Sequence, residues 1–129
     1  MTDPMQAVDT ATADVPRLYP LNGVPTGPDY PYGTYSAILG RGDTYTLSTE
    51  GIRWGRVVVQ TFAHTAEKAL ELAETVRTAL VGTALDITGW STTPCRAELD
   101  PNAVRDPDDQ GVVGVTATYT FTATKEATS

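Results

Sequence analysis

The sequence predicts an α+β domain: a mostly antiparallel, or mixed, sheet of about four strands with one main helix packed on one face. Three observations support this fold class. Residues 65–81 carry apolar side chains at helical spacing, directly after a strand-like run. Residues 113–124 alternate apolar residues with threonines at a period of two. The predicted order is strand, strand, helix, strand, strand, which favours hairpin-like pairing.

The totals fit one folded domain. The chain has 129 residues, of which 40% are hydrophobic. Nine Lys and Arg against sixteen Asp and Glu give a formal charge of −7, which argues against a protein that clamps nucleic acid. A single cysteine forms no internal disulfide, and no run approaches the ~20 apolar residues of a membrane span. The first residues lack the basic start and apolar centre of a signal peptide, so we expect a cytosolic protein that contacts no membrane.

The amino-terminal part is expected to be irregular. Residues 1–16 are rich in Ala, Thr and Asp, and we expect a flexible arm with at most a weak helical turn near Met5–Val8. Residues 17–124 form the predicted domain, and residues 125–129 a polar tail. The proline- and glycine-rich stretch 17–33 predicts extended, irregular backbone. A first strand follows near Tyr35–Leu39, and then a polar loop or short hairpin over Gly40–Ile52.

The second strand, Arg53–Phe62, has apolar residues on both faces. One face presents Trp54, Val58 and Phe62, and the other Val57, Val59 and Thr61. Such a pattern predicts a central strand that is covered on both sides. One helix cannot cover both faces of a sheet, so the far face requires either the prolyl segment or a neighbouring subunit.

The helix is predicted from Thr65 to Val81. Thr65 is a suitable N-cap, and Gly82 provides the stop. Glu67 near the start and Arg77 near the end complement the helix dipole. The apolar residues at helical spacing are Ala66, Ala69, Leu70, Ala73, Val76 and Leu80.

Two closing strands complete the prediction. The segment Cys95–Leu99 alternates apolar and charged residues, and the segment from Val113 to Thr124 has one apolar face and one threonine face. The acidic loop Asp100–Gly111 lies between them.

No residue pattern indicates an enzyme or a cofactor. His64 stands alone at the strand-to-helix turn, without further His or Cys ligands, and we expect a structural role for it. Cys95 falls on an apolar face, as a core residue would. The acidic loop has Asp106 and Asp108 at the spacing of a calcium loop, but Ala117 stands where a bidentate Glu is required. We therefore expect no catalytic residue, no cofactor and no metal.

Three stretches carry a resemblance to a known family: "LYPLNGVPTGPDYPYGTYSAI", "GRVVVQTFAHTAEKALELAETVRTAL" and "VVGVTATYTFTAT". Together they resemble the tail terminator (tail completion) proteins of long-tailed bacteriophages, over residues 17–124. Many members of that family open with an amphipathic helix, for which residues 1–16 are poor material.

The resemblance implies a structural virion protein, assembled in the host cytoplasm and placed at the head-proximal end of the tail. Its copies would form a hexameric ring that caps the completed tail tube and joins it to the head-tail connector protein. DNA would pass through the channel without specific binding. The alternatives are a head-tail connector (stopper) or a tail-tube subunit, and, in another class, a small cytosolic ligand-binding or enzymatic α+β domain.

Contacts to the tail tube protein or the connector are expected from the loops Gly40–Ile52 and Asp100–Gly111, because loops on a rigid scaffold commonly carry interactions. Residues 1–16 are expected to reach the next copy. Arg53 and Arg56 either pair with an acidic neighbour across an interface or are solvated. The candidate interface residues are Arg41, Asp43, Tyr45, Glu50, Arg53, Arg56, Arg105, Asp106, Asp108 and Asp109.

Overall fold

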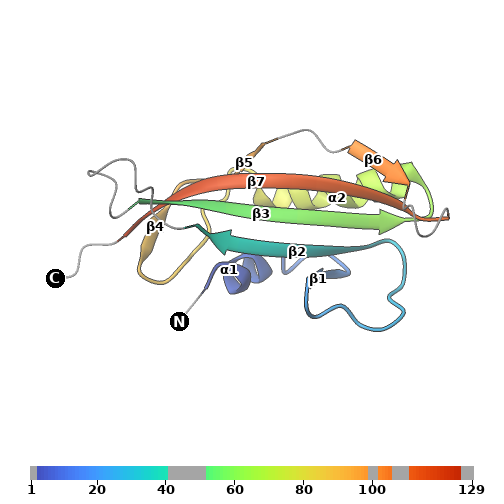
Figure 1. Cartoon of the computed structure of the whole chain (residues 1–129), viewed down its shortest axis with the longest axis horizontal. Coiled ribbons are helices and arrows are strands. Elements are labelled where there is room, and N and C mark those ends of the chain that lie inside the picture. The colour runs from blue at the N-terminus through green and yellow to red at the C-terminus, as the bar shows by residue number, and fades with distance from the viewer. Residues whose placement is uncertain (1–2, 41–51, 99–101, 106–110, 126–129) are drawn as a thin grey trace.

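The computed structural model describes residues 3–40, 52–98, 102–105 and 111–125, the strand at 102–105 by its backbone only. The elements are α1 (Pro4–Ala11), β1 (Leu18–Pro20), β2 (Tyr32–Leu39), β3 (Ile52–Ala63), α2 (Ala66–Leu80), β4 (Trp90–Thr92), β5 (Arg96–Ala97), β6 (Asn102–Arg105) and β7 (Val113–Lys125) (Figure 1). The α+β class is confirmed. None of the helices in these described ranges is long and apolar enough to cross a membrane.

The described strands form one seven-stranded mixed sheet in the order β1-β2-β3-β7, with β4, β5 and β6 all paired with β7. β1 pairs with β2 in parallel, and the other strand pairs are antiparallel. The predicted number of about four strands was too low. The missed strands are short, and a strand of two to four residues is too brief to show alternation. Within the described part of the strand predicted over Cys95–Leu99, only the two residues of β5 are a strand, and Leu99 lies outside the described residues.

The long central strands β3 and β7 pair from Ile52↔Thr124 to Ala63↔Val113. The predicted alternation in β7 is confirmed, because Val113, Val115, Ala117, Tyr119, Phe121 and Ala123 are buried. The intervening threonines point to the opposite face.

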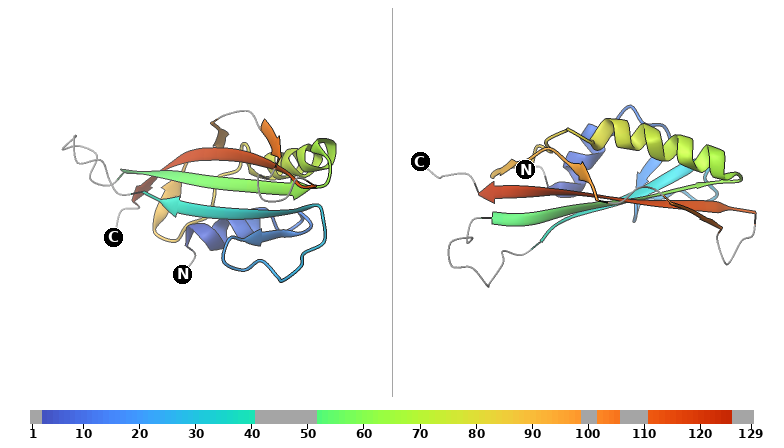
Figure 2. Two further views of the ribbon diagram at one scale, coloured as in Figure 1. Left: turned by 45° about the vertical axis from the view of Figure 1, so that its right-hand side comes forward. Right: turned by 90° about the horizontal axis from the view of Figure 1, so that it is seen from above.

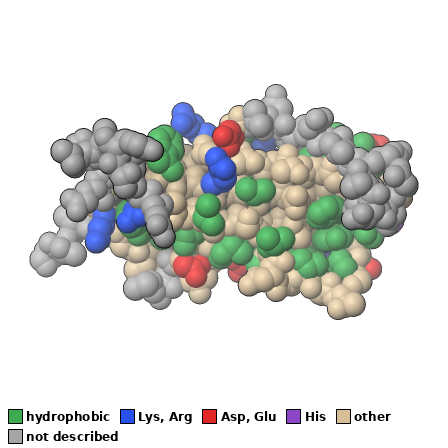
Figure 3. Space-filling model, in the orientation of Figure 1, with side chains coloured by type: hydrophobic (Ala, Val, Ile, Leu, Met, Phe, Trp, Pro, Cys, Tyr) green, Lys and Arg blue, Asp and Glu red, His purple; other side chains and the backbone are tan. Residues whose placement is uncertain are grey.

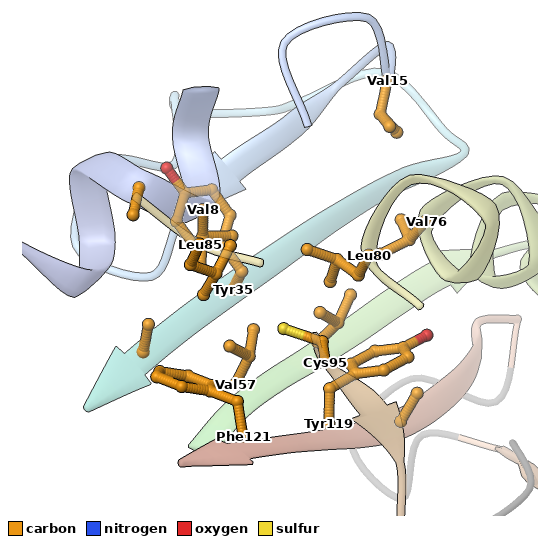
Figure 4. Close-up of a cluster of buried hydrophobic side chains, with 14 of the residues drawn as sticks. Val8, Val15, Tyr35, Val57, Val76, Leu80, Leu85, Cys95, Tyr119 and Phe121 are labelled. Atoms are coloured by element: carbon orange, nitrogen blue, oxygen red, sulfur yellow. The ribbon is translucent and has the colours of Figure 1, made fainter. Parts of the chain in front are cut away.

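Both helices cover the same face of the sheet (Figure 2). Their side chains and the inward side chains of β2, β3 and β7 form the main core, in which Val8, Val57, Leu80 and Tyr119 are almost fully buried (Figure 4). The prolyl segment contributes β1 to the sheet edge beside β2. Trp54 and Ile38, on the other face, are 59% and 61% exposed.

Helix α2 begins and ends as predicted. The Thr65 hydroxyl accepts a hydrogen bond from the Lys68 backbone N–H at 3.2 Å, and Gly82 has a φ of +82°, which favours glycine. One position differs from the predicted apolar stripe. Leu72 is buried, whereas Leu70 is 40% exposed. The helical spacing allowed either leucine to face the core. Leu72 belongs to the main core and Leu70 does not, so the prediction for Leu70 was wrong.

The amino-terminal arm was predicted wrongly for residues 4–11, which form helix α1. Asp3 and Gln6 form a capping box, in which the Asp3 carboxylate accepts from the Gln6 N–H at 2.8 Å and the Gln6 side chain accepts from the Asp3 N–H at 3.1 Å. Pro4 occupies the first turn, where its missing N–H costs nothing. The Tyr35 hydroxyl donates to Asp9 at 3.1 Å and fastens the helix to β2.

Candidate functional site

The face of the sheet opposite the helices, here called the open face, is the most distinctive surface of the described chain. Figure 3 shows it as mostly polar side chains and backbone, with hydrophobic side chains scattered over it. On β3 and β7 its residues are Ile52, Trp54, Arg56, Val58, Gln60, Phe62, Thr116, Thr118, Thr120, Thr122 and Thr124. The predicted division of the second strand into two faces is confirmed. The predicted cover on its second face is not found among the described residues, since Trp54 is 59% exposed.

Two arginines flank one threonine on this face. Arg56 of β3 and Arg96 of β5 are both direct cross-strand partners of Thr120. Directly opposite residues point to the same side of a sheet, and two strand spacings place the arginine backbones about 10 Å apart. Both arginines are exposed. The three residues form a straight row across the strands, which we call the arginine row.

Hollows lie on both sides of Trp54, next to the arginine row. One, of about 360 Å³, is lined by Trp54, Arg96 and Thr120 among others. The second, of about 380 Å³, is lined by Ile38, Trp54, Arg56 and Glu98 among others. Both hollows are open to solvent, so a side chain that protrudes from a partner can enter them.

Of the candidate interface residues, the structure places Arg56 on the open face and Arg53 elsewhere. The half-buried Arg53 guanidinium lies 5.8 Å from the centre of the Trp90 ring and donates to the Gly40 carbonyl at 3.5 Å, so it contacts its own chain. The backbone of Arg105 is part of β6. The remaining candidates lie outside the described residues: Arg41, Asp43, Tyr45, Glu50, Asp106, Asp108 and Asp109.

Sequence reasoning missed Arg96, Ile38 and the role of Thr120. The alternation around Arg96 was visible, but a strand of two residues carries no signal that sets its register against β7. The sequence pattern placed Trp54 on a second apolar face of its strand. It could not predict that this side chain is exposed.

His64 occupies a structural corner. Its Nδ1–H donates to the Gly111 carbonyl at 3.1 Å, which connects the β3–α2 turn to the residues before β7. Its ring packs on Tyr30 at 4.4 Å, and Tyr30, Tyr32 and Phe62 continue the aromatic contact along the sheet. Within the described ranges, no three His, Cys, Asp or Glu side chains are grouped to hold a metal ion.

Cys95 is buried and poorly suited to nucleophilic chemistry. Burial raises the pKa of its thiol from 9.0 to about 11, which disfavours the reactive thiolate. Burial likewise raises the pKa of Tyr35 and of Tyr119 from 10.0 to about 12, with Asp9 adding to the effect at Tyr35. These three groups are core residues.

These raised pKa values predict a loss of stability in alkali. The folded state holds the three protons more tightly than the unfolded state does, so the associated stability is fully present below pH 9.0 and is lost as the pH rises through about 11 and 12. Urea unfolding at successive alkaline pH values should show a falling free energy of unfolding. A variant with Tyr35→Phe, Tyr119→Phe and Cys95→Ala should show a shallower fall over the same range.

Tyr119→Phe is expected to leave the free energy of unfolding unchanged or to raise it by up to about 1 kcal/mol. The Tyr119 hydroxyl is buried and has no hydrogen-bond partner within the part of the chain that the structure describes. Tyr35→Phe is the matched control, because it removes a hydroxyl that donates to Asp9 and should cost about 1 kcal/mol. Urea denaturation of both variants measures this, and a larger loss for Tyr119→Phe would contradict the assignment.

Comparison with known proteins adds a likeness of fold. No protein-family model matches the chain. No curated protein matches it in sequence. Among solved structures, a chain from a structure described as "Virion of native gene transfer agent (GTA) particle" is similar, with a TM-score of 0.65 and 16% sequence identity. The match covers 91% of this chain and 84% of that chain, so the two domains share their architecture over nearly their full length.

Proposed function

We propose that the chain is a structural virion protein of a tailed bacteriophage or phage-like particle, and that it acts as the tail terminator. In this role its copies form a hexameric ring on the head-proximal end of the tail. The ring caps the completed tail tube and joins it to the head-tail connector protein. It acts by assembly, without catalysis and without a cofactor.

The observation that carries the proposal is the likeness of fold to a chain of a gene transfer agent virion over nearly the whole of both chains. Two features of the molecule agree with it. The open face leaves Trp54 and Ile38 exposed on a broad sheet surface, as a subunit that packs against neighbours would. The tail-terminator resemblance of residues 17–124 favours this role among virion proteins.

The charge of the chain suits a channel for DNA. Six copies at a formal charge of −7 carry 6 × −7 = −42. An acidic ring repels the phosphate backbone, so DNA passes through without being held.

Deletion of the gene from the virus or particle that encodes it tests the role and separates it from its neighbours. Loss of a terminator leaves tubes of uncontrolled length without a cap, as seen by electron microscopy. Tails of normal length beside unattached heads would indicate a connector instead, and the absence of tails would indicate a tube subunit. Expression of the wild-type gene in trans is the control, and a deletion that still yields normal particles would exclude all three roles.

Measurement of the purified protein gives a second test. Native mass spectrometry and negative-stain microscopy should show a six-membered ring, alone or on added tail tubes. A single-chain mass under both conditions would contradict the proposal and would favour a small ligand-binding or enzymatic domain.

A further inference from the structure

The outer side of helix α2 carries a stripe that complements the arginine row. Glu67, Leu70 and Glu74 are exposed, and their spacing of three and then four residues places them on one side of the helix. Leu70 is 40% exposed, in the middle of this stripe. Seven residues of helical rise separate the Glu67 and Glu74 backbones by about 10 Å. We call these three residues the acidic stripe.

The arginine row has the same length and the opposite charge. The backbones of Arg56 and Arg96 lie about 10 Å apart, with Thr120 between them. Both surfaces thus have two like charges at the ends and a small or apolar side chain at the centre. The two surfaces therefore match in the distance between their charges, in the opposite sign of those charges and in the uncharged side chain between them.

We propose that the acidic stripe of one copy docks across the arginine row of the next copy. The helix then crosses the strands, Glu67 and Glu74 each pair with one arginine, and Leu70 enters a hollow beside Trp54 and Thr120. This deepens the proposed function, on which it rests, by naming the surfaces through which copies of the chain join.

The arrangement of the two surfaces determines the type of assembly. Helix α2, which carries the acidic stripe, lies on one side of the sheet (Figure 2). The arginine row belongs to the open face on the other side. A contact between two different surfaces is heterologous, and it generates rings when the rotation closes and filaments when it does not. Each copy in a closed ring uses both surfaces once.

The net charge explains why such local pairing is needed. Each copy is acidic overall, at −7, so copies repel one another unless specific opposite charges meet. Arg56 and Arg96 supply two positive charges, and Glu98 is the one acidic side chain in the walls of the two described hollows. The row therefore carries a local excess of positive charge on a chain that is negative overall.

Two reciprocal charge reversals test the contact. The first variant carries Arg56→Glu and Arg96→Glu, and the second carries Glu67→Lys and Glu74→Lys. Each variant alone brings like charges together, so we expect a single-chain mass in native mass spectrometry where the wild type forms rings. In an equal mixture, the Glu row of the first variant meets the Lys stripe of the second. The native row and stripe also meet, so alternating rings should return.

Arg17→Glu with Lys125→Glu is the control for the first variant, because it makes the same change of net charge as that variant at exposed positions away from the row. This variant should keep its rings. Circular dichroism and thermal unfolding show whether each variant is folded. If a reversal variant fails to fold, a second test uses a chain that carries both Leu70→Cys and Thr120→Cys. In this double variant the cysteine at position 70 of one copy should form a disulfide with the cysteine at position 120 of the next copy. The native Cys95 is buried and leaves a low background, so covalent multimers are expected only when both cysteines are present.

The outcomes separate this inference from the proposed function. Rings that persist in both reversal variants, or a mixture that remains monomeric, would overturn the docking of stripe on row while leaving the terminator role in place. A wild-type protein that stays a single chain even beside tail tubes would overturn both.

Discussion

Leu80→Ala is expected to lower the free energy of unfolding by about 3 kcal/mol, within the range for truncation of a fully buried leucine. Leu80 has no exposed surface and packs in the main core from the last turn of α2 (Figure 4). Truncation removes transfer free energy and leaves a cavity, because the surrounding sheet and helix relax only in part. A domain of this size commonly has a total stability of about 5–15 kcal/mol, so the loss is large. Urea denaturation of the purified protein measures it.

Leu70→Ala is the matched control for this prediction. The two leucines belong to the same helix, but Leu70 is 40% exposed, and its truncation should change the free energy of unfolding by less than about 1 kcal/mol. Equal losses for the two variants would show that the burial of α2 has been assigned incorrectly.

Gly55→Ala is expected to cost about 2–3 kcal/mol, the upper part of the range for overpacking. Gly55 of β3 lies directly opposite Phe121 of β7, and the Phe121 ring lies over it. A Cβ built at Gly55 would overlap the Cζ, Cε1 and Cε2 atoms of the Phe121 ring. Phe121 is 3% exposed and surrounded by core residues, so its ring cannot move aside freely. Thermal and urea unfolding of the variant measure the loss.

A double-mutant cycle tests the physical reason for that cost. In a Phe121→Ala background the space above residue 55 is empty, and Gly55→Ala should then be close to neutral. The coupling free energy between the two positions should therefore be about 2 kcal/mol. Additive effects would mean that the cost of Gly55→Ala comes from the backbone conformation at position 55 and not from a clash with the Phe121 ring.

The long elements could be predicted from the sequence because their patterns repeat. The alternation in β7 extends over more than ten residues, and Thr65 and Gly82 mark the ends of α2. Over a pattern of that length, one or two residues that break the periodicity do not change the predicted element. The α+β class followed from these two elements and from the order of the others.

The short elements could not be predicted, since they depend on tertiary contacts. β4, β5 and β6 each pair with a different part of β7, and such pairings leave no pattern in segments of two to four residues. The helix α1 was missed for a different reason. The sequence signal for this helix is the capping box of Asp3 and Gln6. The Ala, Thr and Asp content of residues 1–16 instead led to the prediction of a flexible arm.

The candidate site shows the same division. The second apolar face of β3 and the threonine face of β7 were visible as alternation. The arginine row was not, because it combines residues from β3, β7 and β5 that lie up to 64 positions apart, Arg56 and Thr120. The spacing of residues along one sequence does not predict which residues of distant strands lie opposite one another.

The position of β7 between β3 and the short strands β4, β5 and β6 has a consequence for synthesis of the protein. β7 follows all the other strands in the chain, and yet β3, β4, β5 and β6 each pair with it. A nascent chain can form the β2–β3 hairpin, with β1 paired to β2, and α2, but β4, β5 and β6 have no strand to pair with until residues 113–125 emerge. Folding is therefore completed only after translation of this strand. A product of premature termination before this strand lacks the pairing partner of β3, β4, β5 and β6, and it also lacks Thr120 of the arginine row.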